Sequence, residues 1–468
     1  MATTPANLAP SRPPISFWQL AGVAGVLTLL AAALLVVLLR VSRTPLTALP
    51  ERQPGMDRPA PAGGATAEQN PLLLGKLIPG PGQPANIAGA WPGFRGDGRN
   101  IATSRVGTQW KELWRVSLGE GYAGAAVRDG RVYVFDYDQT AQADALRCLS
   151  LADGREIWRY AYPVKIKRNH GMSRTVPAVT DKFVVALGPK CHLLCVDSET
   201  GEFRWGRDLV QEFHVEVPQW YAGQCPLIDG DRVILATGGD ALFVALDLAT
   251  GQVLWQTPNP RGWKMTHSSP VPFEFAGQRQ YVACLSGGVA GIAADDGRLL
   301  WETDAWKIPI ATVPSPVVVG DGRIFLCGGY NAGSLMLQLT PTGPQELFRL
   351  KASEFGATQH TPVLYQNHLY GVRPDGQLTC LDLDGNIRWT SGSANKFGLG
   401  PFLVTNGQIL VLNDDGWLTL AEANPTAYRQ IARARVLTGH EAWGPMALVN
   451  GRLLARDLTQ MVCLDVRP

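Results

Sequence analysis

Leu151-Ala-Asp-Gly-Arg-Glu-Ile-Trp158 carries a pattern that repeats along the chain: a turn of acidic and small residues, a glycine, then an aromatic residue. Further copies read Asp197-Ser-Glu-Thr-Gly-Glu-Phe-Arg-Trp205, Asp247-Leu-Ala-Thr-Gly-Gln-Val-Leu-Trp255, Asp295-Asp-Gly-Arg-Leu-Leu-Trp301 and Asp382-Leu-Asp-Gly-Asn-Ile-Arg-Trp389. Phe348 and Tyr428 end two degenerate copies. A period of about 40–50 residues indicates an array of supersecondary units.

Each unit contains short apolar runs ahead of its aromatic residue. In the second unit they are Thr175-Val-Pro-Ala-Val-Thr, Lys182-Phe-Val-Val-Ala-Leu and His192-Leu-Leu-Cys-Val-Asp. Their length and their Val, Leu and Phe content are typical of strands. Asp-Gly, Gly-Asp and Asn-Gly pairs separate such runs and supply the positive φ angles that tight hairpins need. Four antiparallel strands at this period predict the blade of a β-propeller.

The aromatic residues that end the units give the number of blades. They are Trp158, Trp205, Trp255, Trp301, Phe348, Trp389 and Tyr428. The last unit, residues 443–465, lacks a fourth strand, whereas Glu112-Leu-Trp114-Arg-Val-Ser-Leu118 has the outer-strand pattern without inner strands before it. We therefore predict that this N-terminal strand completes the last blade and closes the ring. The fold class is all-β, an eight-bladed propeller of four-stranded blades, with seven blades as the alternative.

The repeated tryptophans and cysteines are expected to be structural. A large aromatic at a fixed blade position packs one blade on the next, and burial of such a side chain contributes about 1.5–3 kcal/mol. Cys148, Cys195, Cys380 and Cys463 share one third-strand position in different blades, too far apart for disulfides, so they are interpreted as small buried hydrophobes. The Cys191-x3-Cys195 spacing has no second pair, and no metal site is predicted.

The N-terminal part of the chain differs in composition from the repeats. After a tail of residues 1–14, residues 15–40 are apolar up to Arg40 and long enough for an uncleaved transmembrane signal anchor. Residues 41–90 are rich in Pro, Gly and Ala, as expected of a flexible linker, and residues 91–468 form the propeller. Basic residues flank both ends of the anchor, so we place the propeller outside the cytoplasm by analogy rather than by charge. The net charge of +2 and the absence of basic runs argue against a nucleic-acid partner.

The connections that lead from one blade's outer strand to the next blade's inner strand are expected to ring the mouth of the central channel. They contain five of the seven histidines and four tryptophans outside the blade positions, which suits a planar or anionic ligand. The alternative is that polar residues simply collect in loops and tryptophans seal the channel. No nucleophile–base pair follows from the spacing, so no catalytic residue is predicted. The candidate ligand-binding residues are His170, Arg174, Trp220, Trp263, His267, Trp306, Lys307, His360, His440 and Trp443.

Three motifs resemble the repeat of the pyrroloquinoline-quinone-like (PQQ-like) β-propellers: Ser315-Pro-Val-Val-Val-Gly-Asp-Gly-Arg-Ile-Phe-Leu326, Leu194-Cys-Val-Asp197 and Thr250-Gly-Gln-Val-Leu-Trp255. Trp91-Pro-Gly-Phe-Arg-Gly96 is similar to a segment of membrane-attached, planctomycete-like bacterial members. The resemblance covers roughly residues 91–468 and is specific for fold but weak for activity.

The resemblance implies two functions. One branch contains non-catalytic scaffolds, including the lipoprotein of the outer-membrane barrel-assembly machinery. The other contains quinoprotein dehydrogenases, in which Ca²⁺-assisted PQQ oxidises alcohols or sugars beside an adjacent Cys-Cys pair. This chain has no Cys-Cys pair, and its connections carry more Lys, Arg and His than carboxylate, a poor cage for Ca²⁺. We therefore predict a membrane-tethered, extracytoplasmic scaffold without a cofactor that binds a protein partner or a ligand, with the PQQ-dependent dehydrogenase as the alternative.

Overall fold

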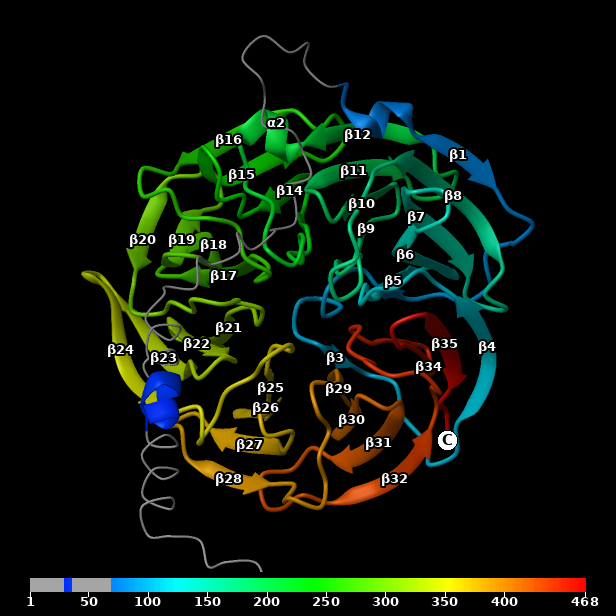
Figure 1. Ribbon diagram of the computed structural model, residues 1–468. Coiled ribbons are helices and arrows are strands. Elements are labelled where there is room, and N and C mark those ends of the chain that lie inside the picture. The colour runs from blue at the N-terminus through cyan, green and yellow to red at the C-terminus, as the bar shows by residue number, and fades with distance from the viewer. Residues whose placement is uncertain (1–28, 36–68) are drawn as a thin grey trace, which may run out of the picture. The chain divides into compact units, whose positions relative to one another are not determined.

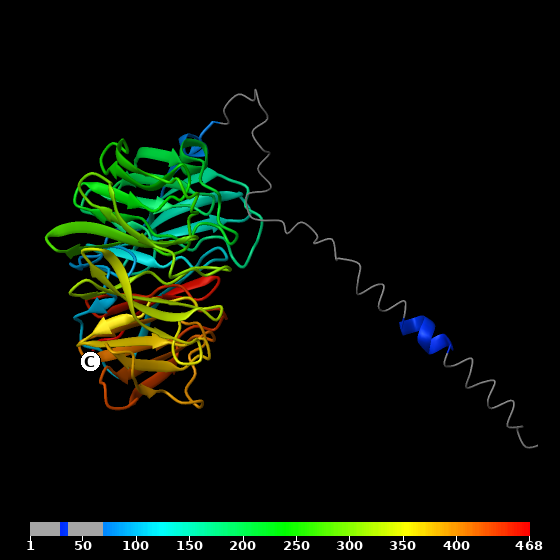
Figure 2. The same cartoon turned by 90° about the vertical axis from the view of Figure 1, so that its left-hand side faces the viewer.

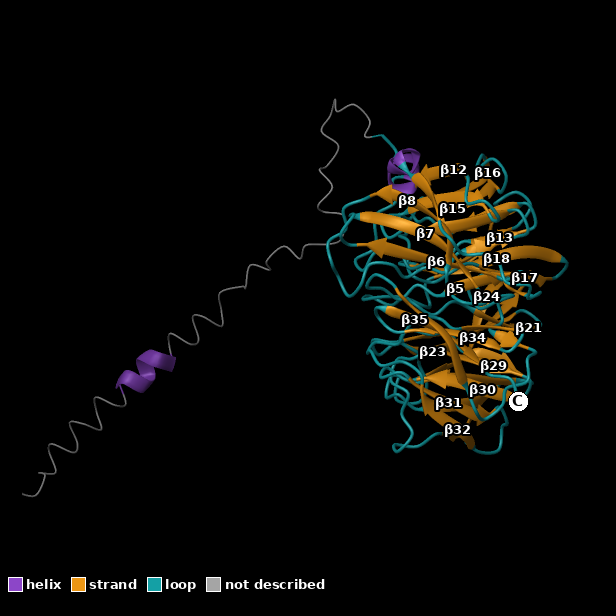
Figure 3. Ribbon diagram, turned by 90° about the vertical axis from the view of Figure 1, so that its right-hand side faces the viewer, coloured by secondary structure: helices purple, strands orange, loops and turns teal. Residues whose placement is uncertain are grey.

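Eight β-sheets surround one central axis in the computed structural model, which describes residues 29–35 and 69–468 (Figure 1). Each sheet contains four antiparallel strands that are ordered from the axis outward, consecutive in sequence in all blades but the last. Figure 2 and Figure 3 show the propeller from its sides, with strands making up most of its regular structure. The prediction of an all-β propeller with eight four-stranded blades is confirmed, and the seven-bladed alternative is wrong.

The strands follow the blades in order. Blade 1 consists of β5 (Ala125–Arg128), β6 (Arg131–Asp138), β7 (Ala143–Ser150) and β8 (Glu156–Pro163), and blade 2 of β9 (Ala178–Val179), β10 (Phe183–Leu187), β11 (His192–Asp197) and β12 (Phe203–Asp208). Blade 3 consists of β13 (Leu227–Asp229), β14 (Arg232–Leu235), β15 (Ala241–Asp247) and β16 (Val253–Pro258), and blade 4 of β17 (Val271–Phe275), β18 (Gln278–Leu285), β19 (Gly288–Ala293) and β20 (Leu299–Thr303). Blade 5 consists of β21 (Val317–Gly320), β22 (Arg323–Gly328), β23 (Gly333–Thr340) and β24 (Gly343–Leu350), and blade 6 of β25 (Val363–Tyr365), β26 (His368–Val372), β27 (Leu378–Asp382) and β28 (Ile387–Thr390). Blade 7 consists of β29 (Phe402–Thr405), β30 (Gln408–Leu412), β31 (Trp417–Glu422) and β32 (Gln430–Arg435), and blade 8 of β33 (Ala447–Val449), β34 (Arg452–Arg456), β35 (Gln460–Asp465) and β4 (Lys111–Ser117). A short helix, α2 (Leu209–Phe213), follows blade 2.

The last blade is completed by the N-terminal part of the propeller. Its strand order is β33-β34-β35-β4, and β4 pairs antiparallel with β35 so that Trp114 lies opposite Cys463. Trp114 is buried, and its indole N–H donates to the Leu151 carbonyl of blade 1. The predicted closure of the ring by an N-terminal strand is therefore confirmed.

The repeated glycine and aromatic residue contact each other across neighbouring blades. In blade 3, Gly251 has a positive φ of 70°, and a Cβ on it would lie 2.5 Å from the Trp205 ring of blade 2. The Trp205 indole N–H donates to the Leu248 carbonyl of the same blade-3 turn, at 2.9 Å. Only a glycine allows both the backbone conformation and the close approach. The same contact joins Trp114 to Gly154, Trp158 to Gly201, Trp255 to Gly297 and Phe348 to Gly385.

Three aromatic residues depart from this arrangement. Trp389 donates its indole N–H to the Asn424 carbonyl of blade 7, at 2.7 Å, and is not among the rings that face a turn glycine. Tyr428 precedes β32, and Ala432 occupies the position opposite Leu420 that aromatic residues take in other blades, so the assignment of Tyr428 to an outer strand is wrong. Tyr428 instead packs against Trp389 and Phe397. Trp301 bonds to Gln280 of its own blade, at 2.7 Å, rather than to blade 5. The predicted role of the cysteines is confirmed, since all eight are free and buried.

Regular structure begins before the predicted propeller boundary at residue 91. The 3-10 helix η1 (Pro71–Leu74) and β1 (Lys76–Pro79) lie on the outer side of blade 1, where β1 pairs with β8. β2 (Ala90–Trp91) pairs with β5 at the inner side. The predicted linker of residues 41–90 therefore extends too far toward its C-terminal end, because residues 71–79 belong to blade 1.

The predicted membrane anchor, residues 15–40, lies outside the described residues except for 29–35, which are helical. These seven residues and the propeller belong to separate compact units. Within residues 29–35 and 69–468, no helix combines the length and the apolar character needed to cross a membrane.

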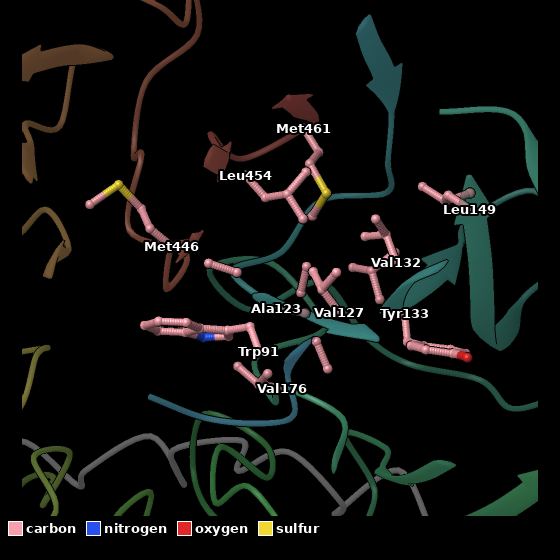
Figure 4. Close-up of a cluster of buried hydrophobic side chains, with 14 of the residues drawn as sticks. Trp91, Ala123, Val127, Val132, Tyr133, Leu149, Val176, Met446, Leu454 and Met461 are labelled. Atoms are coloured by element: carbon pink, nitrogen blue, oxygen red, sulfur yellow. The ribbon is translucent and has the colours of Figure 1, made fainter. Parts of the chain in front are cut away.

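Residues 91–102, here called the axial plug, run through the centre of the ring (Figure 1). The Pro92 carbonyl accepts from Val179 N–H of blade 2, and the Arg95 guanidinium donates to the Pro362 carbonyl next to blade 6, at 3.1 Å. Farther along, β3 (Ile101–Ala102) pairs with β29 of blade 7. Figure 4 shows Trp91 in a buried apolar cluster with Val127, Val176 and Met446. The plug thus contacts inner strands from opposite sides of the ring.

A girdle of hydrogen bonds joins the inner edges of five blades. Cys225 N–H donates to Ser269 Oγ, Ser269 N–H to Ser315 Oγ, and Ser315 N–H to Thr361 Oγ1, each at 2.9 Å. Val176 N–H donates to Cys225 Sγ at 3.2 Å. Each of these residues directly precedes a proline, and the inner strand begins after that proline. The girdle fixes the spacing of the connections above it.

Candidate functional site

A cavity of about 310 Å³ lies among the connections that lead into the inner strands. This is the lower end of the range for small-molecule sites, roughly 300–1,000 Å³. Phe94 of the axial plug forms part of its wall. The lining residues are Phe94, Tyr122, His170, Arg174, Trp220, Gly223, Cys225, His267, Ala311, Val313, Tyr330, Gln359, His360, Trp443 and Pro445.

The lining follows a simple rule of position. In six blades, the residue four positions ahead of the inner strand reaches the cavity: these are Arg174, Gly223, His267, Val313, Gln359 and Trp443. All of these residues except Trp443 stand three positions before the proline that precedes the inner strand. The chain here turns toward the axis, and the girdle holds the next residues in place. The fold therefore presents a ring of equivalent positions with unlike side chains.

Arg174 brings a positive charge to the cavity. Its Nη1 donates to the carbonyls of Gly171 and Met172, and its Nη2 to those of Asn169 and His170, at 2.9–3.3 Å. Within the described part of the chain, no carboxylate forms an ion pair with it. Burial lowers the pKa of the guanidinium to about 10, so Arg174 remains charged at neutral pH. The loop carbonyls orient this charge but do not neutralise it.

Aromatic side chains form one wall beside Arg174. The guanidinium lies over the Tyr122 ring, 5.7 Å from its centroid, and the Tyr122 and Trp443 centroids are 5.1 Å apart. The Tyr122 hydroxyl donates to Glu441 Oε2 at 2.6 Å. Burial, followed by this hydrogen bond, raises the pKa of Tyr122 above its usual value, so its proton is held. This wall combines flat apolar faces with a cation–π contact.

His267 and His360 are neutral at physiological pH. Burial, together with the Arg174 charge, lowers the pKa of His267 to about 4, and its Nε2–H donates to the Tyr221 carbonyl at 2.9 Å. Burial lowers the pKa of His360 to about 4, with a hydrogen bond to the Trp443 backbone opposing the shift. His360 Nε2 is buried and finds no hydrogen-bond partner among the described residues. An unsatisfied buried polar atom beside a cavity is a group that a ligand can pair with.

The structure brings together six of the ten predicted site residues: His170, Arg174, Trp220, His267, His360 and Trp443. Four do not line the cavity. Trp263 and Trp306 are buried in clusters between blades, at 7% and 2% exposure. Lys307 is exposed and pairs with Asp304 at 3.1 Å, and His440 is exposed. These four residues lie outside the cavity lining, and their assignment as ligand-binding residues stays a prediction. Distance along the chain does not separate them from the lining, because His170 and Trp220 stand eight and seven residues ahead of their inner strands and still reach the cavity.

Sequence reasoning missed several lining residues. Gln359 and Val313 could have been found, since each stands three residues before an inner-strand proline, as Arg174 and His267 do. Tyr330 lies in a hairpin between β22 and β23, and Phe94 lies in the plug. No local pattern connects those two residues with the axis.

A family model matches residues 142–391, more than half of the chain, and its description is outer membrane protein assembly factor BamB. The chain belongs to this family. The match to the BamB family confirms the PQQ-like propeller resemblance, and it spans the region that contributes most of the cavity lining.

Individual proteins agree with this assignment. The outer membrane protein assembly factor BamB of Yersinia pestis is 26% identical over 308 residues, covering 60% of this chain and 76% of the relative. The crystal structure of BamB from Moraxella catarrhalis is similar with a TM-score of 0.53 at 15% identity, over 76% of this chain and all of that chain. A europium-containing methanol dehydrogenase gives a TM-score of 0.59 at 11% identity, over 81% and 98% of the two chains. Both structural similarities show the fold alone.

The cavity does not fit a Ca²⁺-assisted quinone. Ca²⁺ takes six to eight oxygen ligands, mostly from carboxylates and amide carbonyls. The lining has no Asp, Glu or Asn side chain, and Gln359 is its single side-chain amide. Across residues 29–35 and 69–468, no cluster of three or more His, Cys, Asp or Glu side chains could hold a metal ion. The BamB-family cavity here instead carries one arginine and three histidines between aromatic walls.

Proposed function

We propose that this chain is a membrane-tethered, extracytoplasmic scaffold whose cavity-bearing face binds a protein partner in outer-membrane protein assembly. The observation that carries the proposal is a set of exposed and half-buried apolar side chains at or beside the cavity of a BamB-family propeller. Ile310, next to the lining residue Ala311, is 54% exposed, and Tyr330 is 40% exposed. Trp220 adds a half-buried indole at the same mouth. Exposed aromatic and aliphatic side chains rimmed by polar groups mark protein interaction sites.

The opposite face has a different character. It carries the turns that join the first and second strands of the blades, such as Asp129-Gly130, Asn406-Gly407 and Asn450-Gly451, in which both residues have positive φ. These turns are tight and polar, and they serve the hairpins. The connections on the cavity face are longer and hold the aromatic residues. We therefore assign the partner to the cavity face.

The chemistry of the lining favours binding over catalysis. Burial raises the pKa of the Cys225 thiol to about 11, and its Sγ accepts a girdle hydrogen bond from Val176. A thiol of this pKa is a poor nucleophile at neutral pH. His267 and His360 have pKa values of about 4, so their imidazoles are weak bases at neutral pH.

The dehydrogenase alternative is tested by calorimetric titration of the full chain with PQQ, with and without Ca²⁺, followed by a dye-linked oxidation assay. We expect no Ca²⁺-dependent gain in affinity and no dye reduction, because the lining lacks hard oxygen ligands. Micromolar, Ca²⁺-dependent binding with turnover would replace the scaffold with an enzyme.

The membrane tether rests on residues 15–40, whose apolar length suits a bilayer span. The test adds protease to cells whose outer membrane has been permeabilised and whose inner membrane is intact. We expect the protease to cut the linker and release the propeller, so that an N-terminal fragment stays bound to the membrane. Full protection of the chain in such cells would place the propeller in the cytoplasm and contradict the proposal.

The partner surface is tested by charge substitution on the full chain. The double variant Ile310→Asp, Tyr330→Asp is expected to lose co-purifying outer-membrane assembly proteins, because it places charge in an apolar contact. The matched control is Ile387→Asp on β28 at the circumference, where Ile387 is 41% exposed. Retention of the same partners by the rim variant, or equal loss in the control, would contradict the proposal.

A further inference from the structure

We propose that the axial cavity binds a small aromatic acid: a flat, mostly apolar molecule with one carboxylate and one hydroxyl or N–H donor. Arg174 receives the carboxylate, Tyr122 and Trp443 pack on the flat body, and His360 accepts from the donor group. This inference goes beyond the scaffold role and does not depend on it. It follows from three features of the lining.

The first feature is an uncompensated cation. All four hydrogen bonds of Arg174 go to carbonyls of its own loop and use Nη1 and Nη2, which leaves Nε–H outside this set. Nearby, Arg168 pairs with Glu120, and the Glu441 carboxylate accepts from the Tyr122 hydroxyl and keeps its charge. Neither glutamate lines the cavity, so Arg174 is the one Arg, Lys, Asp or Glu side chain of the lining. A buried charge without a partner favours an anionic ligand.

The second feature is the shape and polarity of the walls. The Tyr122 and Trp443 rings pack against each other and both line the cavity, and Trp220, Phe94 and Val313 complete an apolar lining. Aromatic walls of this kind bind planar molecules through stacked or edge contacts. The volume of about 310 Å³ suits a ligand of one or two rings.

The third feature is an unused acceptor. His360 Nε2 is buried and has no hydrogen-bond partner among the described residues. A neutral imidazole has one N–H donor and one acceptor nitrogen, and in the proposed complex Nε2 of His360 is the acceptor. A ligand that pairs with this nitrogen supplies a donor as well as a carboxylate.

The test is a titration of the full chain in detergent with a matched series: 4-hydroxybenzoate, 4-hydroxybenzamide and benzoate. Calorimetry and tryptophan fluorescence are the readouts. We expect 4-hydroxybenzoate to bind most tightly, and loss of the charge in the amide to weaken binding by about tenfold or more. Loss of the hydroxyl in benzoate should weaken it by about three- to tenfold. No saturable binding of any probe at millimolar concentration, or equal affinity for acid and amide, overturns the proposal.

Variants locate the site. Arg174→Gln is expected to abolish the preference for 4-hydroxybenzoate over 4-hydroxybenzamide. His360→Phe is expected to abolish the preference for 4-hydroxybenzoate over benzoate. Arg168→Gln is the matched control: it lies in the same connection, its side chain is 63% exposed, and it is outside the lining. Unchanged acid selectivity in a folded Arg174→Gln protein overturns the assignment. If that variant does not fold, the ligand series on the unsubstituted protein still decides the charge requirement.

Discussion

His267 and His360 link the stability of the propeller to pH. Each has a folded-state pKa of about 4, below the usual value of about 6.5. Between these values the unfolded chain takes up protons that the folded chain does not, so stability is complete above pH 6.5 and falls as the pH drops toward 4. We expect the two residues to contribute a loss on the order of 1–3 kcal/mol each, measured as a lower thermal midpoint.

The double variant His267→Gln, His360→Gln should show a flatter thermal midpoint between pH 6.5 and 4 than the unsubstituted chain. His440→Gln, which changes an exposed histidine outside the cavity, should keep the original pH dependence. A double variant with the same slope as the unsubstituted protein would show that the two cavity histidines do not titrate in this way.

Distance along the chain to the inner strand predicts part of the site. Arg174 and His267 stand four residues before an inner strand and line the cavity. His440 and Trp306 stand farther ahead in other connections and do not line it, but His170 and Trp220 stand eight and seven residues ahead and do. Residue type alone could not separate these cases, because aromatic and basic side chains serve both the mouth of the cavity and the packing between blades.

The turn glycines allow a sharp test at the level of the blade. Gly251→Ala places a side chain on a residue with left-handed backbone conformation, which costs about 1–2 kcal/mol of folding free energy. The new Cβ would also lie 2.5 Å from the Trp205 ring of the preceding blade. Gly230→Ala has a similar φ of 63° but open space around it. We expect Gly251→Ala to destabilise the protein by at least 1 kcal/mol more than Gly230→Ala, since overpacking costs about 1–3 kcal/mol.

Chemical denaturation of both variants measures this difference. Equal free energies of unfolding would mean that the glycine serves the turn conformation alone, and that its contact with the neighbouring blade adds nothing.

Most blade elements followed from the sequence because the repeat combines turn chemistry with packing. The glycine and the aromatic residue recur together because the ring of one blade packs against the turn glycine of the next, as Trp158 packs against Gly201. Tyr428 was assigned wrongly because its blade uses Ala432 at that position and no local signal distinguishes the two. The axial plug was missed because its contacts, such as Arg95 with Pro362, join residues that are distant in sequence.

Ring closure is a property of the whole molecule. A chain that begins at residue 111 retains β4, whereas one that begins at residue 119 lacks it, and both lack the axial plug. We expect the shorter chain to aggregate or to melt at lower temperature, because β35 becomes an open edge and the burial of Trp114 is lost. The soluble fraction and the thermal midpoint measure the effect. Equal behaviour of the two chains would show that the N-terminal strand does not close the ring.

The central claim is that the cavity-bearing face contacts a protein partner, and photo-crosslinking in living cells tests it most directly. A photoreactive amino acid at Tyr330 on the rim is compared with one at Ile387 on the circumference, positions that are 40% and 41% exposed. We predict a discrete adduct with an outer-membrane assembly protein from position 330 and none from position 387. No adduct at 330, or the same adducts from both positions, would contradict the account.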